Sequence, residues 1–239
     1  MATIDDELGV PPDVRASGAF YGRRKGHALR PRQAELLASL LPRLAVDLTV
    51  PARKNLATLF PTEVERVDLE IGFGGGEHLV ARAQANPRVG FIGCDPFING
   101  MAKVLVAIET LRLDNIRLYH GDATELLAWL PPAALSRIDL LYPDPWPKRR
   151  HWKRRFIQDA SVAALARVLK SGAEFRFATD WPDYAAWALE RLLRSPAFIW
   201  TAERADDWRR PWPDFSRTRY EAKALREQRT PCYLTFRRV

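Results

Sequence analysis

Apolar residues in this chain occur either as short continuous runs or as stripes at helical spacing, and the two kinds of segment alternate. Five short runs, each typical of a buried strand and each followed by a helical pattern, cover residues 67–72, 89–94, 116–121, 138–143 and 173–179. Strands that alternate with helices in this way predict a parallel sheet covered by helices on both faces. The sequence therefore predicts an α/β fold.

The segments at either end of this alternation complete the predicted architecture. Residues 31–44 carry leucines at helical spacing behind Pro31, a residue that suits the first turn of a helix. The apolar runs at 197–202 and 232–238 have no helical pattern between them. We therefore expect these two runs to pair antiparallel at one edge of a mostly parallel, seven-stranded sheet.

Length and composition fit one domain with a short appendage. Of the 239 residues, 47% are hydrophobic, which is enough for a substantial core. We expect a single domain over 31–239, preceded by a flexible basic arm over 1–30, where glycines interrupt any helix. The chain has no apolar run of the roughly 18 residues that a membrane-spanning helix needs. Its acidic start is unlike a signal peptide, so we predict a cytoplasmic protein.

Cysteine and histidine positions give no indication of a metal site. Cys94 and Cys232 are too few and too far apart for a disulfide framework or a zinc cluster, and buried thiols are expected. The four histidines are scattered, and none lies at metal-ligand spacing from a cysteine or an aspartate. Nothing in the sequence indicates an obligate protein partner.

Positive charge is concentrated in two stretches. Residues 15–32 and residues 148–155 each contain six Lys or Arg and no acidic residue. Together they contribute +12 to a net charge of +8, so the rest of the chain sums to 8 − 12 = −4. A mildly acidic body with two basic patches favours a localised binding site for a polyanion, although each patch alone could be a solvated loop.

Each of the five predicted strands ends at or near an acidic residue. In a parallel sheet these residues all project toward the edge where ligands of such folds bind. A single acid in this position is more simply a helix N-cap, and Asp180, which directly precedes a helical pattern, suits that alternative especially well. Five acids in register favour a shared ligand-binding edge formed by Glu70, Asp95, Asp122, Asp144 and Asp180.

The turn after the first strand, EIGFGGGEHL, indicates which ligand fits this edge. Gly72, Gly74 and Gly76 let a ligand approach the backbone closely, but a dinucleotide fingerprint needs a third glycine where Glu77 stands. Glu70 and Glu77 also place negative charge where a pyrophosphate would lie. A cationic ligand with sugar hydroxyls, such as S-adenosylmethionine, suits the turn better than a nicotinamide dinucleotide, which stays an alternative.

Several motifs resemble a known family. EIGFGGGEHL followed by GCDPF resembles the first two motifs of class I S-adenosylmethionine-dependent methyltransferases, which have a Rossmann-like fold. YPDPWPKRRHWKRR, together with ATDWPDYA and FSRTRYE, resembles the tRNA (guanine-N7)-methyltransferase family from about residue 18 to the end. The departures are Asp95, where many relatives have Glu, and Trp152, where His is common.

The resemblance implies roles for particular residues. Asp144 would be catalytic, Asp95 would hold the ribose hydroxyls, and Asp122 would lie near the adenine amine. The implied cofactor pocket consists of Glu70, Gly72, Gly74, Asp95, Asp122 and Asp144. The implied substrate and RNA contacts are Lys148, Arg150, His151, Trp152, Lys153, Arg154, Arg155, Asp180, Thr218, Arg219, Tyr220 and Glu221.

The implied reaction is methylation of N7 of guanine 46, in the variable loop of tRNA. Neutral guanine has a lone pair and no proton at N7, so the reaction needs alignment and charge stabilisation rather than a general base. A carboxylate held between Pro143 and Pro145 could supply both. Trp146 either stacks on a base or packs against these prolines. The alternatives are a methyltransferase for another nucleic-acid base, and an RNA-binding protein on a methyltransferase fold.

Overall fold

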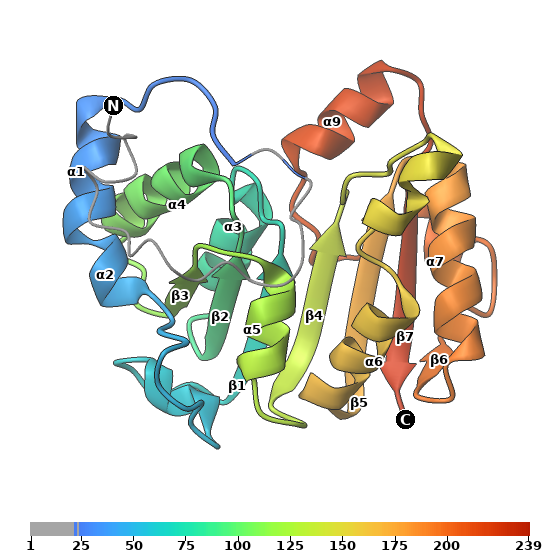
Figure 1. Cartoon of the computed structure of the whole chain (residues 1–239), viewed down its shortest axis with the longest axis horizontal. Helices are drawn as coiled ribbons and strands as arrows, with labels where there is room; N and C mark the ends of the chain where they lie inside the picture. The colour runs from blue at the N-terminus through green and yellow to red at the C-terminus, as the bar shows by residue number, and fades with distance from the viewer. Residues whose placement is uncertain (1–21, 23) are drawn as a thin grey trace.

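One seven-stranded sheet forms the centre of the molecule (Figure 1). The computed structural model describes Gly22 and residues 24–239. Across the sheet the strands follow the order β3 (Ile116–Tyr119), β2 (Val89–Cys94), β1 (Arg66–Ile71), β4 (Leu135–Leu141), β5 (Leu169–Thr179), β7 (Cys232–Arg238) and β6 (Phe198–Trp200). The first five are parallel, and β7 runs antiparallel to both of its neighbours. The predicted mostly parallel sheet with an antiparallel edge pair is confirmed.

Helices cover both faces of this sheet. On β2, Phe91 belongs to one apolar cluster, whereas the next residue, Ile92, belongs to the other, because successive side chains of a strand point to opposite faces. The cluster around Ile92 packs under α5 (Ala123–Trp129), α6 (Asp159–Val168) and α7 (Pro182–Arg194). The cluster around Phe91 packs under α1 (Pro31–Ser39), α3 (Glu77–Ala85) and α4 (Ile98–Leu111).

Two local expectations were wrong. The predicted helix over 31–44 is two helices, α1 and α2 (Leu41–Leu44), and the break precedes Pro42, which has no N–H to continue the hydrogen-bond ladder. The segment between β6 and β7 contains α8 (Asp206–Arg209) and α9 (Arg219–Arg226). In α9 only Glu221 and Ala224 are buried, so there is little apolar periodicity to detect.

The amino-terminal arm is described only in part, since residues 1–21 and 23 lie outside the described residues. The following stretch lies against the start of α4. The backbone N–H of Ile98 donates to the carbonyl of Arg24 at 3.0 Å, and Asn99 bonds to both Gly26 and His27. Two short 3₁₀ helices complete the described elements: η2 (Leu56–Leu59) and η3 (Arg149–Arg154).

A buried ionic layer lies on the face of the sheet that carries α3. Arg82 of α3 donates to Asp68 of β1 at 3.0 Å and to Asp139 of β4 at 2.8 Å, and all three are buried. Burial raises the pKa of both carboxyl groups, and the Arg82 cation opposes that rise. The guanidinium is therefore the counter-charge that lets two acids sit inside the fold.

The same layer holds the segment that precedes α9. Asp214 accepts hydrogen bonds from Arg137 of β4 and Arg176 of β5, each at 2.7 Å. Although burial opposes ionisation, these two guanidinium groups hold the pKa of Asp214 well below its usual range. The ion pairs anchor this segment to the middle of the sheet.

Replacing Arg82 with Met should lower the free energy of unfolding by about 3–5 kcal/mol, because two buried carboxylates then lose their cation. Urea unfolding at neutral pH measures the change. The matched control is Arg88→Met, which breaks a 2.7 Å ion pair with Glu65 between two exposed side chains and should cost less than about 1 kcal/mol. Equal costs for the two variants would contradict the importance of the buried layer.

Candidate active site at the carboxyl ends of the strands

The sheet order brings the five strand-end acids into one row. Strands β3, β2, β1, β4 and β5 are consecutive neighbours and parallel, so their carboxyl ends lie at one edge. The acids that follow them appear there in the order Asp122, Asp95, Glu70, Asp144 and Asp180. After β1 the chain builds outward to β2 and β3, and it then returns to β4 on the other side of β1. Ligands of open α/β sheets bind at such a switch in strand order.

Asp95 is buried at this switch and is held by backbone donors. Its two carboxylate oxygens accept hydrogen bonds from the N–H groups of Gly74 and Phe97, each at 2.7 Å. Burial and, to a smaller extent, the nearby charges of Glu70 and Asp144 raise the pKa of Asp95, the two hydrogen bonds lower it, and the result is a pKa of about 6. Each oxygen accepts one bond from the protein and keeps a lone pair for a ligand hydroxyl.

The glycine-rich turn adopts a backbone that favours glycine. Gly72, Gly74 and Gly76 have φ angles of 72°, 56° and 77°, in the left-handed region. Gly74 is also closely covered, since a Cβ atom there would lie 2.9 Å from the ring of Tyr220. On its other side, a Cβ on Gly100 would lie 1.9 Å from the Gly74 carbonyl oxygen. The turn is thus fixed between α4 and α9.

The two glutamates that bracket this turn both have partners. Glu70 lies 2.9 Å from Nδ1 of His78, and Glu77 forms an ion pair with Arg219. Burial opposes a charged imidazole, but the Glu70 carboxylate more than offsets it and raises the pKa of His78. The two glutamates are therefore not the free charges facing the ligand that the sequence predicts. Their pairing weakens the argument against a pyrophosphate that rested on charge repulsion alone.

Asp122 and Asp180, at the two ends of the row, have local partners. Asp122 caps α5, and its carboxylate accepts a hydrogen bond from the N–H of Thr124 at 2.8 Å. Asp180 lies 2.5 Å from Nε of Arg229, and the N-cap of α7 is Trp181. The N-cap alternative that the sequence left open for Asp180 is therefore wrong, and the acid of this row that caps a helix is Asp122.

Asp144 lies in a constrained loop after β4. Tyr142 and Trp146, on either side of the Pro-Asp-Pro sequence, have φ angles of 51° and 44°. Left-handed backbone at residues other than glycine costs about 1 kcal/mol or more each and clusters at functional sites. Asp144 is exposed and forms no hydrogen bond or ion pair with a described residue, yet the surrounding protein excludes enough water to raise its pKa. It is a carboxylate held in place and open at the edge of the sheet.

The basic run after Asp144 divides into exposed and packed side chains. Lys148, Arg149, Arg150 and Lys153 are exposed. Trp146 is half-buried, with its ring 5.8 Å from that of His151 and 5.0 Å from the guanidinium carbon of Arg154. Arg155 is buried, and the guanidinium carbon lies 4.8 Å from the ring centroid of Trp152. The six positive charges predicted as one patch therefore do not share one environment.

The Thr218–Glu221 segment begins α9 and also divides in two. Thr218 and Glu221 are both buried, and Thr218 caps the helix, because its hydroxyl accepts a hydrogen bond from the backbone N–H of Glu221 at 3.1 Å. Glu221 also accepts from the hydroxyl of Tyr233 at 2.5 Å. Arg219 and Tyr220 lie instead over the glycine-rich turn, and Figure 1 shows α9 above the carboxyl end of β4. The T-x-x-E spacing is the signal that could have predicted this helix from sequence.

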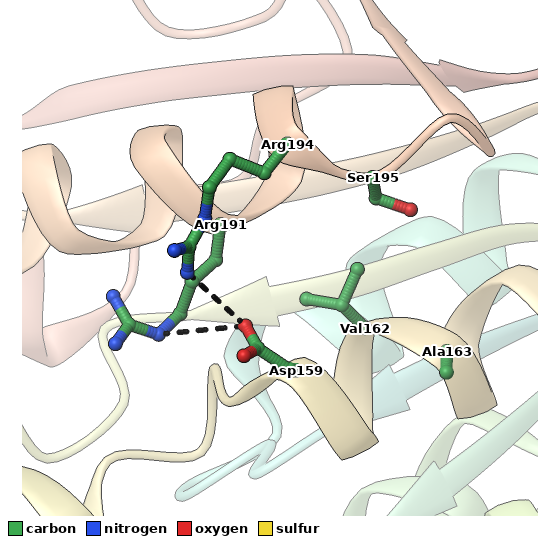
Figure 2. Close-up of a pocket in the computed structure, with 6 residues that line it drawn as sticks. All are labelled: Asp159, Val162, Ala163, Arg191, Arg194 and Ser195. Carbon is green, nitrogen blue, oxygen red and sulfur yellow. Dashed lines mark hydrogen bonds and ion pairs between the residues drawn. The ribbon is translucent and has the colours of Figure 1, made fainter.

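A cavity of about 310 Å³ lies away from this edge, between α6 and α7 (Figure 2). Asp159 points into it and lies 3.9 Å from Arg191 and 3.4 Å from Arg194. Each positive charge there faces an acid of the same protein, and none of the five strand-end acids lines the cavity.

Among Gly22 and residues 24–239, no three His, Cys, Asp or Glu side chains are arranged to hold a metal ion. None of the helices in these residues combines the length and the apolar composition that crossing a membrane requires.

Comparison with known proteins agrees with this geometry. A family described as "Putative methyltransferase" matches residues 65–234. A tRNA (guanine-N(7)-)-methyltransferase from Nitrobacter hamburgensis is 60% identical over 98% of this chain and 91% of its own length. Another, from Rhodopseudomonas palustris, is 61% identical over 98% of this chain and 92% of its own. The chain belongs to the tRNA (guanine-N7)-methyltransferase family.

Among solved structures, the 16S rRNA methyltransferase KamB has a TM-score of 0.53 at 18% identity, covering 74% of this chain and 90% of that one. This similarity concerns the fold alone and confirms the Rossmann-like methyltransferase class. Trp152 is one of the two departures from the family that the sequence shows. In the structure its ring packs against the guanidinium of Arg155.

Proposed function

We propose that the protein transfers the methyl group of S-adenosylmethionine to N7 of guanine 46 in tRNA. The observation that carries this proposal is the 60–61% identity, over 98% of the chain, to relatives that bear the name of this activity. The proposal includes tRNA as the partner, the cytoplasm as the compartment and residues 31–239 as one domain. The exposed Asp144 at the switch in strand order supports it from geometry.

The residues at the edge fit S-adenosylmethionine. Gly72 and Gly74 keep side chains away from the site, and Asp95 has spare lone pairs for the ribose hydroxyls. Glu70, paired with His78, and Asp122 lie on either side of Asp95, and the carboxylates of Asp95 and Asp122 suit a ligand that carries a sulfonium and an ammonium. When bound, S-adenosylmethionine supplies the electrophilic methyl group. Every other task falls to residues of this chain.

Asp144 has the properties that the acceptor base requires. Guanine N7 has no proton to lose, so Asp144 acts by accepting hydrogen bonds from N1–H and the exocyclic amine and by stabilising the positive charge that develops on the ring. Its flanking prolines limit the backbone freedom that would otherwise be lost on binding. The carboxylate thus orients the base and stabilises the product with one group.

Exposed cations next to Asp144 supply the RNA surface. Lys148, Arg149, Arg150 and Lys153 are open to solvent and adjoin the catalytic loop. Their contacts to phosphates position the substrate without reading its sequence. Arg219 and Tyr220 approach from α9 on the other side of the glycine-rich turn.

Incubating the protein with unmodified tRNA and labelled S-adenosylmethionine, followed by nucleoside analysis, tests the proposal. We expect 7-methylguanosine as the labelled product and no labelling of a tRNA with adenosine at position 46. A label on an exocyclic amine would instead support the rival methyltransferase. Tight tRNA binding with no transferred label would support an RNA-binding protein that has lost catalysis.

Replacing Asp144 with Asn should lower kcat about 10²-fold, because the variant keeps the shape of the side chain but removes the negative charge. The Kd for tRNA should change little, since phosphate contacts supply most of the affinity. Single-turnover methylation and filter binding measure the two quantities. Near-normal turnover would remove Asp144 from the catalytic role.

Cofactor affinity should depend on the ionisation of Asp95. Its pKa of about 6 predicts that the Kd for S-adenosylmethionine rises about tenfold between pH 7 and pH 5, as the carboxylate becomes protonated. Because burial raises this pKa above its unfolded value, the contribution of Asp95 to folding stability changes in the opposite direction and is lost as pH rises through 6. Calorimetric titration across this range measures the affinity. In Asp95→Asn the affinity should be weaker and the pH dependence near 6 should be absent; a dependence that persists would contradict this assignment.

A further inference from the structure

Arg155 differs from the other cations of the basic run. Its exposed fraction is 2%, whereas Lys148, Arg149, Arg150 and Lys153 are exposed. A buried guanidinium cannot reach a phosphate in solvent without leaving its surroundings. Its contacts within the protein therefore determine what it does.

Three aromatic rings surround the Arg155 guanidinium. The ring centroids of Trp152, Tyr184 and Trp187 lie 4.8, 5.0 and 5.2 Å from its central carbon. A cation over aromatic faces is stabilised most when it is desolvated, as it is here. Arg191 packs on the Trp187 ring as well, at 3.1 Å from the centroid, and supports this side of the cage.

The caged guanidinium bonds to the catalytic loop. Nε of Arg155 donates to the carbonyl oxygen of Pro145 at 2.8 Å, and Pro145 directly follows Asp144. The backbone of Arg155 is fixed too, because its carbonyl accepts from Nε2 of Gln158 at 3.0 Å. The peptide between Pro145 and Trp146 is thus tied to α7 through a side chain that packs tightly against three aromatic rings.

We propose that Arg155 is a positioning residue that holds the Asp144 loop in place, and that it does not contact RNA. The proposal rests on the proposed function for the role of Asp144. The aromatic cage fixes the guanidinium, the guanidinium fixes the Pro145 carbonyl, and that carbonyl fixes the carboxylate of the preceding residue. A displacement of about 1 Å in a catalytic group can cost about 10²-fold in rate, so such a support has a measurable effect.

Two substitutions of Arg155 and one control variant separate positioning from phosphate binding. Arg155→Met keeps an aliphatic stem in the cage but removes the donor, and kcat should fall about tenfold, with an unchanged salt dependence of tRNA binding. Arg155→Lys keeps a donor and should recover part of kcat. Lys153→Ala, an exposed cation two residues away, should raise KM and lower the slope of log K against log salt by about 1.

Coupling to Asp144 is measured with a double variant. If Arg155 acts through Asp144, the Arg155→Met substitution should lower the single-turnover rate constant much less in the Asp144→Asn variant than in the wild-type protein. A loss as large as in the wild type would overturn the proposal. The proposal would also be overturned if the slope of log K for tRNA binding against log salt fell as much in Arg155→Met as in Lys153→Ala.

Hydrogen exchange tests the same support without relying on activity. In Arg155→Met the backbone amides of Tyr142, Asp144, Trp146 and Lys148 should exchange faster, while those of β1 and β2 keep their wild-type protection. Unchanged exchange in the loop would overturn the proposal even if the protein methylates tRNA. If wild-type protein fails to methylate tRNA but the loop exchange responds, the proposed function is wrong and the support of the loop by Arg155 stands.

Discussion

The parallel pairing of β1 with β2 on one side and β4 on the other is the constraint from which the site follows. Register pairs Ile71 with Cys94 and with Leu140, so the three strands end together. The glycine-rich turn, Asp95 and the Asp144 loop must then meet at one place. A hydrogen bond links Asp95 to the glycine-rich turn, because its carboxylate accepts from the backbone N–H of Gly74. A polar edge built this way needs no side chain to reach across the sheet.

Charge compensation distinguishes the five acids of this edge. Glu70 pairs with a histidine, Asp122 caps a helix, Asp180 pairs with an arginine and Asp95 accepts two backbone N–H groups. Within the described residues, Asp144 has no such partner. Its charge is the one available for a group that arrives from solvent, which is what methylation of a base that becomes cationic requires.

The positive charges follow a similar division. In the run from 148 to 155, four lysines and arginines are exposed to solvent, while Arg155 packs inside an aromatic cage and bonds to the loop beside it. Arg219 likewise pairs with Glu77 at the glycine-rich turn. Basic residues in this protein therefore occur both on the exposed surface, where the proposed function places the RNA, and inside the protein, where they bond to the loops at the edge of the sheet.

The sequence by itself determined the α/β alternation, the antiparallel edge, the acids at the strand ends and the glycine-rich turn, because each is written in residues that are near neighbours along the chain. Only the tertiary structure decided which charges are compensated and which are open. Arg155 meets Tyr184 and Trp187, and Arg219 meets Glu77 from 142 positions away. Local patterns contain no information on such distant contacts, since burial depends on which segments the fold brings together.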